Sequence, residues 1–123
     1  MKNVIKVLSL TLVLVMMLGL LVSCGPNKDP KKAGEALDDA GYLVILNDKD
    51  LLLPDGVKAT VLATTDDDYI FITYYEDADA VKEAWENAQE EAKELEKKYE
   101  DIVCKKSGKM IYIGTKQAVK DAR

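Results

Sequence analysis

Hydrophobic residues along this chain recur with two different periods. Steps of three and four predict helices that begin after Asp29-Pro30 and after Asp77, where an aspartate can cap the first turn. The first helix would end at Gly41, the second would extend to Tyr99, and a short last helix would begin after Thr115. The sequence therefore predicts three helices.

Between these helices, apolar and polar residues alternate with the period of two that is typical of strands. The expected strands are 42–46, 57–64, 69–75, 102–106 and 109–113. Residues 65–68 would close a first hairpin in which Thr64 pairs with Tyr69, and Ser107-Gly108 would close a second. Residues 51–53 would pack under a loop or add a short strand.

The predicted order is helix, strand, hairpin, helix, hairpin, helix. Hairpins interrupted by helices favour an α+β domain with a mostly antiparallel sheet of about five strands. We expect the helices to pack on one face of this sheet, the side of Val61, Ile72 and Ile111. No linker divides the pattern, so residues 29–123 would form a single domain.

If all helices cover one face, the opposite face is left outward and rich in aromatic residues. Its members would include Leu62, Tyr69, Phe71, Tyr75, Met110 and Tyr112. Such a surface suits a partner protein, a glycan or self-association. A helix or the loop at 51–53 could instead cover it, and both interpretations stay open.

The first residues have a different pattern. Lys2 and Lys6 precede an uncharged run from Val7 to Val22, which is shorter than the roughly 20 apolar residues that cross a bilayer. Small residues follow before Cys24. A positive start, an apolar stretch and a small-residue cleavage site are typical of a secretory signal, and an uncleaved signal anchor is the alternative.

Leu21-Val22-Ser23-Cys24 resembles the lipobox of bacterial lipoproteins, in which Leu, a small or aliphatic residue and Gly, Ala or Ser precede a Cys. The resemblance implies diacylglycerol on the sulfur of Cys24, cleavage before it, and anchoring to the outer side of the bacterial cytoplasmic membrane. Residues 1–23 would then be the signal peptide and residues 24–28 a lipidated tether. The globular part resembles small uncharacterised lipoproteins of Gram-positive bacteria.

Cleavage makes the chain more acidic. All 22 acidic residues would remain, whereas Lys2 and Lys6 would be lost from the 17 basic ones, which gives 15 minus 22, or −7. An anionic membrane repels an acidic domain, so the lipid would have to hold it there. The same sign argues against nucleic acid as a partner.

Catalytic groups are sparse. The chain has no histidine, and Ser107 is the one serine after the predicted cleavage site. A Ser or Cys triad therefore has no base. Two carboxylates could still catalyse hydrolysis, but no pair stands out. We expect no enzyme and no cofactor.

Two further groups have candidate chemistry. Asp66, Asp67 and Asp68 are weak candidates for calcium, which prefers carboxylate oxygens, and a solvated turn is the alternative. Cys104 has no intramolecular partner if Cys24 carries lipid. A buried thiol is expected there, with a reactive thiol as the alternative.

Together these features predict a membrane-anchored extracytoplasmic lipoprotein that binds a ligand without catalysis. An accessory structural subunit of a cell-envelope complex is the main alternative. A carboxylate-based enzyme and a calcium-binding protein are the others.

Overall fold

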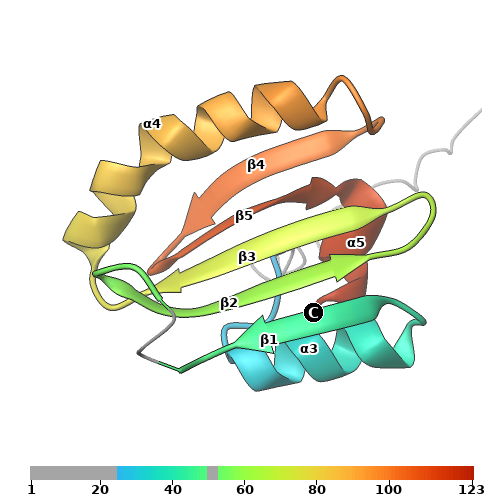
Figure 1. Ribbon diagram of the computed structural model, residues 1–123, viewed down its shortest axis with the longest axis horizontal. Helices are drawn as coiled ribbons and strands as arrows, with labels where there is room; N and C mark the ends of the chain where they lie inside the picture. Colours follow the sequence, from blue (N-terminus) through green and yellow to red (C-terminus); the bar gives the residue numbers. More distant parts are fainter. Residues whose placement is uncertain (1–24, 50–52) are drawn as a thin grey trace, which may run out of the picture.

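A computed structural model describes residues 25–49 and 53–123 (Figure 1). Its elements are α3 (Pro30–Asp39), β1 (Leu43–Asn47), β2 (Val57–Thr64), β3 (Tyr69–Tyr75), α4 (Ala78–Leu95), β4 (Ile102–Ser107), β5 (Met110–Thr115) and α5 (Lys116–Asp121). Their order is the predicted one. The predicted signal peptide, the lipobox and most of the 51–53 segment lie outside the described residues.

The five strands form one antiparallel sheet in the order β1-β2-β3-β5-β4. Pairing of β3 with β5 joins the two hairpins in the middle of the sheet. Every residue of β5 is buried, because β5 has a strand on each side and helices on both faces. The α+β class and the predicted pairing of Thr64 with Tyr69 are confirmed.

The helices begin where the sequence predicts. Side-chain oxygens of Asp29, Asp77 and Thr115 each accept a hydrogen bond from a backbone N–H in the first turn of α3, α4 and α5. These bonds satisfy donors that have no partner within the helix. α4 ends at Leu95, earlier than predicted, and turns continue to Tyr99. Among the described helices, none is both long enough and apolar enough to cross a bilayer.

The helices cover both faces of the sheet, which differs from the expected packing on one face (Figure 1). α3 and α5 pack on the face that carries Val61 and Ile72. α4 packs on the opposite face, over Ile111 and Ile113 of β5. The reason is that α3 and α5 already occupy the first face, so the apolar stripe of α4 is buried on the other.

The second hairpin closes one residue later than predicted, at Gly108-Lys109. Gly108 has φ +61°, a conformation that glycine adopts without steric penalty. Cys104 therefore pairs with Ile113 instead of Ile111. Because the register changes by two residues, every side chain keeps its predicted face within the hairpin.

Residues 25–28, expected as a tether, are packed against the domain. Pro26 is buried. The backbone N–H of Asn27 donates to the carbonyl oxygen of Ala122 at 2.8 Å, and the hydroxyl of Tyr74 donates to the carbonyl oxygen of Asn27 at 2.7 Å. The folded unit therefore includes this segment.

Candidate binding surface

One row of cross-strand neighbours extends over all five strands, and the exposure of its side chains shows which part of this sheet face α4 covers. The row consists of Ile45, Leu62, Phe71, Ile113 and Cys104, one from each strand. Ile45 is 58% exposed, whereas Ile113 is 3% exposed. α4 covers the row over β5 and β4 and leaves its β1–β3 part uncovered.

We call the uncovered part of this face the open half. Its apolar and aromatic members are Leu43, Ile45, Leu62, Tyr69, Phe71 and Tyr75. Leu43 is 73% exposed, and the members from β2 and β3 are half-buried. Cross-strand pairing places these side chains next to one another, so their apolar surface is continuous.

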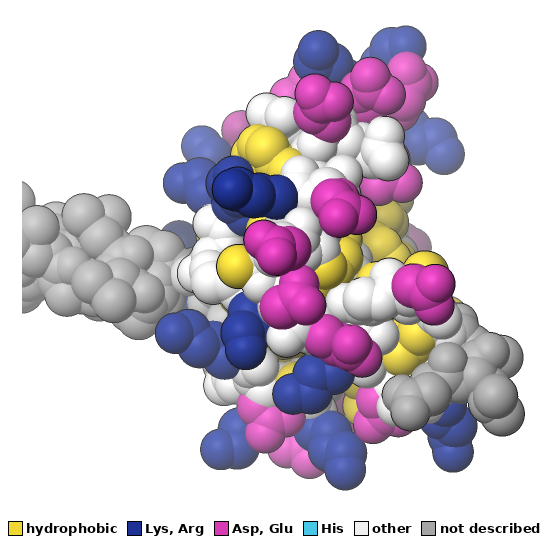
Figure 2. All heavy atoms as spheres, turned by 90° about the vertical axis from the view of Figure 1, so that its left-hand side faces the viewer, with side chains coloured by type: hydrophobic (Ala, Val, Ile, Leu, Met, Phe, Trp, Pro, Cys, Tyr) yellow, Lys and Arg dark blue, Asp and Glu magenta, His cyan; other side chains and the backbone are white. Residues whose placement is uncertain are grey.

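α4 and the open half together enclose a recess of about 290 Å³. Its lining includes Thr60, Phe71 and Tyr75 from the sheet and Ala84, Asn87 and Glu91 from α4. Glu91 is the one charged residue among the described residues that line it. Figure 2 shows the molecule indented on its right-hand side, with hydrophobic side chains in the indentation.

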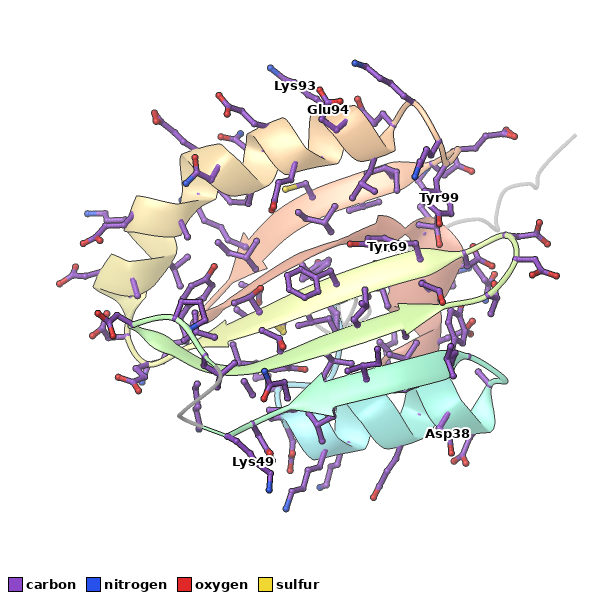
Figure 3. The ribbon with its side chains drawn as sticks, viewed as in Figure 1. Asp38, Lys49, Tyr69, Lys93, Glu94 and Tyr99 are labelled. Carbon is purple, nitrogen blue, oxygen red and sulfur yellow. The ribbon has the colours of Figure 1, made fainter. Side chains whose placement is uncertain are left out.

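An aromatic pair links the turn that follows α4 to the sheet near one end of the open half. The rings of Tyr69 and Tyr99 stack with their centroids 5.5 Å apart (Figure 3). Burial raises the pKa of Tyr69, and the negative charge of Glu91 raises it further. Burial also raises the pKa of Tyr75; a side-chain hydrogen bond with Thr73 partly offsets this, and the charge of Glu91 adds a smaller increase. Both hydroxyls therefore stay protonated at neutral pH.

Two members of the predicted face lie on the opposite side of the sheet. Met110 and Tyr112 are only 4% and 5% exposed and belong to the core under α3 and α5. Tyr112 pairs with Ile72 and therefore shares the face of Ile72. Within each hairpin the side chains alternate between the two faces as predicted. Which face of one hairpin continues into which face of the other depends on the register of β3 with β5.

Leu43 and Ile45 belong to the open half but were not predicted as part of it. The continuous apolar run at 43–46 is typical of a strand that is buried on both faces. The sequence of the run therefore contains no signal that this strand lies at an edge of the sheet.

The three adjacent aspartates do not converge on one point. Thr65 Oγ1 accepts hydrogen bonds from the backbone N–H groups of Asp67 and Asp68 at 3.3 and 2.9 Å. Asp68 Oδ1 accepts one from Thr115 Oγ1 at 2.7 Å, while Asp66 and Asp67 are exposed. Asp68 thus ties this turn to the start of α5. Among the residues that the structure describes, no group of three or more Asp, Glu, Cys or His side chains could hold a metal ion.

Cys104 is half-buried beneath α4. Its Sγ donates to the carbonyl oxygen of Ala88 at 3.7 Å. Burial raises the pKa of the thiol, and the charge of Glu91 adds to this. Since the thiolate is the reactive form, this environment disfavours a nucleophilic role.

No protein-family model, no curated protein and no solved structure matches this chain. The function proposed for the domain therefore rests on the geometry of the open half and its recess.

Proposed function

We propose that this protein is a lipoprotein, held at the outer side of the bacterial cytoplasmic membrane by lipid on Cys24, and that its domain is a binding module without catalytic activity. The observation that supports binding is the apolar surface of the open half, where Leu43 is 73% and Ile45 58% exposed. Contiguous apolar surface of this kind on a soluble domain marks a site of interaction.

The recess beside the open half supports the same proposal. Ligand sites are concave, mostly apolar and supplied with a few polar groups that orient the ligand. Phe71 and Tyr75 supply aromatic surface here, and Asn87 and Glu91 supply the polar groups. The apolar part of a partner would lie on the open half, and a polar or cationic group would reach Glu91.

An enzymatic role has less support. Hydrolysis by two carboxylates needs an acid and a base that face the same bond. Glu91 is the one carboxylate among the described residues that line the recess, so the second carboxylate is missing there. The chain also has no histidine to act as a base.

Site-specific photocrosslinking in living cells tests the binding surface. A photoreactive amino acid in place of Ile45 should form a covalent adduct, whose mass shows whether the partner is a protein, a glycan or a second copy. The matched control is Asp38, which is exposed on α3 (Figure 3). Equal adduct yields at the two positions, or none at Ile45, would contradict the proposal.

The exposed apolar edge strand also favours a second candidate, an accessory subunit of an envelope complex. Light scattering after size exclusion separates the two candidates. A binding module should be monomeric, or form a discrete dimer if its partner is a second copy, whereas an unpartnered subunit should aggregate.

The anchor has its own test. Protein purified from membranes of a bacterium that processes lipoproteins should have the intact mass of residues 24–123 plus diacylglycerol. The mass of the full chain, or of a cleaved chain without lipid, would contradict the anchor.

A further inference from the structure

A second recess, lined by Tyr74, Tyr75 and Met110 at one end of the sheet, has only basic residues as its charged lining. Its volume is about 310 Å³, and Lys28, Lys58 and Lys109 contribute to its wall. No Asp or Glu among the described residues lines it. Three cations around one concave site are suited to a phosphate-bearing group.

The basic surface continues to the point where the described chain begins. An adjoining recess shares Lys28 with the first and adds Gly25 and Arg123. A third recess shares Lys28 and Lys58 with the first, and Asp29 and Asp48 line it together with Lys31. Figure 2 shows Lys and Arg side chains along the left-hand side of the described residues and a band of Asp and Glu side chains down the middle of the view.

Gly25 lies close to the folded domain, so only a short length of chain would separate the domain from a lipid anchor on Cys24. The segment that follows it is fixed to the domain, because Asn27 bonds to both Ala122 and Tyr74. Consecutive Cα atoms are about 3.8 Å apart, so lipid on the neighbouring Cys24 would draw this part of the surface to the bilayer.

We propose that Lys28, Lys58, Lys109 and Arg123 form a membrane-docking surface that contacts the headgroups of anionic phospholipids. The inference rests on the proposed anchor at Cys24. The net charge of −7 expected for the mature chain repels an anionic membrane overall, but the charge is unevenly distributed over the surface, and the first recess has only lysines as charged residues. An anionic surface attracts the basic side and repels the acidic side, so both forces orient the domain in the same way.

This orientation leaves part of the binding surface accessible. The basic recess lies at the end of the sheet where Val57 pairs with Tyr75, and Tyr75 of the open half also lines it. Leu43 and Tyr69 lie at the opposite end of their strands, so docking would direct that end of the open half away from the bilayer.

Lysine acetylation on vesicles tests the orientation. The full chain, processed and lipidated in a bacterial host, is reconstituted into phosphatidylcholine vesicles with and without phosphatidylglycerol, and mass spectrometry follows each lysine. On the anionic vesicles Lys28, Lys58 and Lys109 should react several-fold more slowly. Lys82 and Lys93, which are exposed on α4, should react at the same rate on both (Figure 3).

A matched pair of variants tests whether charge is the cause. Each basic residue close to an anionic surface contributes roughly five-fold to binding. Lys58→Gln should therefore weaken the protection of Lys28 and Lys109, and Lys82→Gln, which removes the same charge from α4, should not. Equal acetylation rates on both kinds of vesicle, or equal slowing of the α4 lysines, would overturn the proposal.

The intact mass of the purified protein shows whether Cys24 carries lipid, so the proposed anchor and the proposed docking surface can be tested independently. If Cys24 carries no diacylglycerol, the anchor is wrong, and co-sedimentation of the unlipidated chain with the same vesicles at low salt decides the docking surface. Binding to anionic vesicles that Lys58→Gln weakens roughly five-fold would support it. Absence of binding would overturn it.

Discussion

Two positions of one sheet face, on the edge strand β1 and on the interior strand β5, differ greatly in exposure. Ile45 on β1 and Ile113 on β5 are the same residue type in the same cross-strand row, yet they are 58% and 3% exposed. A helix is about 10–12 Å across and strands are about 4.8 Å apart, so one helix covers about two strands. α4 lies mainly over β4 and β5 and also contacts Tyr75 of β3, and among the described residues the most exposed side chains of this face are on β1. Position under a helix, not the pattern of the strand, decides what is exposed.

The largest expected effect comes from truncating these two isoleucines of the row. Ile113→Ala should lower the free energy of unfolding by about 2–5 kcal/mol, because it leaves a cavity under α4. Ile45→Ala should lower it by no more than about 0.5 kcal/mol, because its side chain is mostly in water already. Urea denaturation measures both, and equal losses would show that β1 is covered in solution.

Two glycines extend the comparison from side chains to backbone. A Cβ on Gly114 of β5 would lie 2.6 Å from the carbonyl oxygen of Tyr69, so Gly114→Ala should destabilise by about 1–3 kcal/mol. A Cβ on Gly34 of α3 would meet Val44 Cγ1 at 3.6 Å, which is ordinary contact. Gly34→Ala should therefore stabilise by about 0.5–1 kcal/mol through helix propensity.

Thermal unfolding of both variants and of the parent protein shows whether each substitution raises or lowers the stability. A stabilising Gly114→Ala would mean that β3 and β5 lie further apart than in this structure. A destabilising Gly34→Ala would mean that α3 packs more tightly on β1.

Local signals in the sequence were enough to predict the elements but not their assembly. Asp77 caps α4 as its residue type and position predict, and Thr64 pairs with Tyr69 across a short loop. The pairing of Ile72 with Tyr112 joins segments far apart in the chain, and no local alternation encodes it. Local alternation therefore predicted that Leu62 and Phe71 share a face, but it placed Tyr112 on the wrong side of the sheet relative to them.

Alkaline pH should lower the stability of the domain mainly through tyrosines on the sheet face that α3 and α5 cover. Burial raises the pKa of Tyr74 and of Tyr42, whose hydroxyl also donates to Asp121 at 2.8 Å. A raised pKa means that the folded state holds the proton more tightly. Stability is therefore complete below about pH 10, the ordinary tyrosine value, and is lost as the pH rises from there toward the folded pKa.

Phenylalanine variants measure this loss. Tyr74→Phe should cost about 1 kcal/mol at neutral pH, since its hydrogen bond to Asn27 is lost, but should reduce the further loss above pH 10. Tyr69→Phe on the half-buried open half should reduce the alkaline loss less. Denaturation at a series of pH values gives both results, and the reverse order would contradict the burial of Tyr74.

The smallest expected effect is a difference between two glutamates of α4 in their influence on the thiol of Cys104. Glu91 raises the pKa of Cys104, whereas Glu94 pairs with Lys97 at 3.4 Å and is 75% exposed. Glu91→Gln should therefore lower the pKa of the thiol and increase its alkylation rate in mildly alkaline solution, and Glu94→Gln should leave the rate unchanged. Both variants should stay within about 0.5 kcal/mol of the parent in stability, as is usual for surface changes. Since only a carboxylate directed toward the sheet can act on Cys104, the pH profile of alkylation tests whether Glu91 faces the recess. Equal profiles for the two variants would place its charge in solvent and remove the polar end of the proposed ligand site.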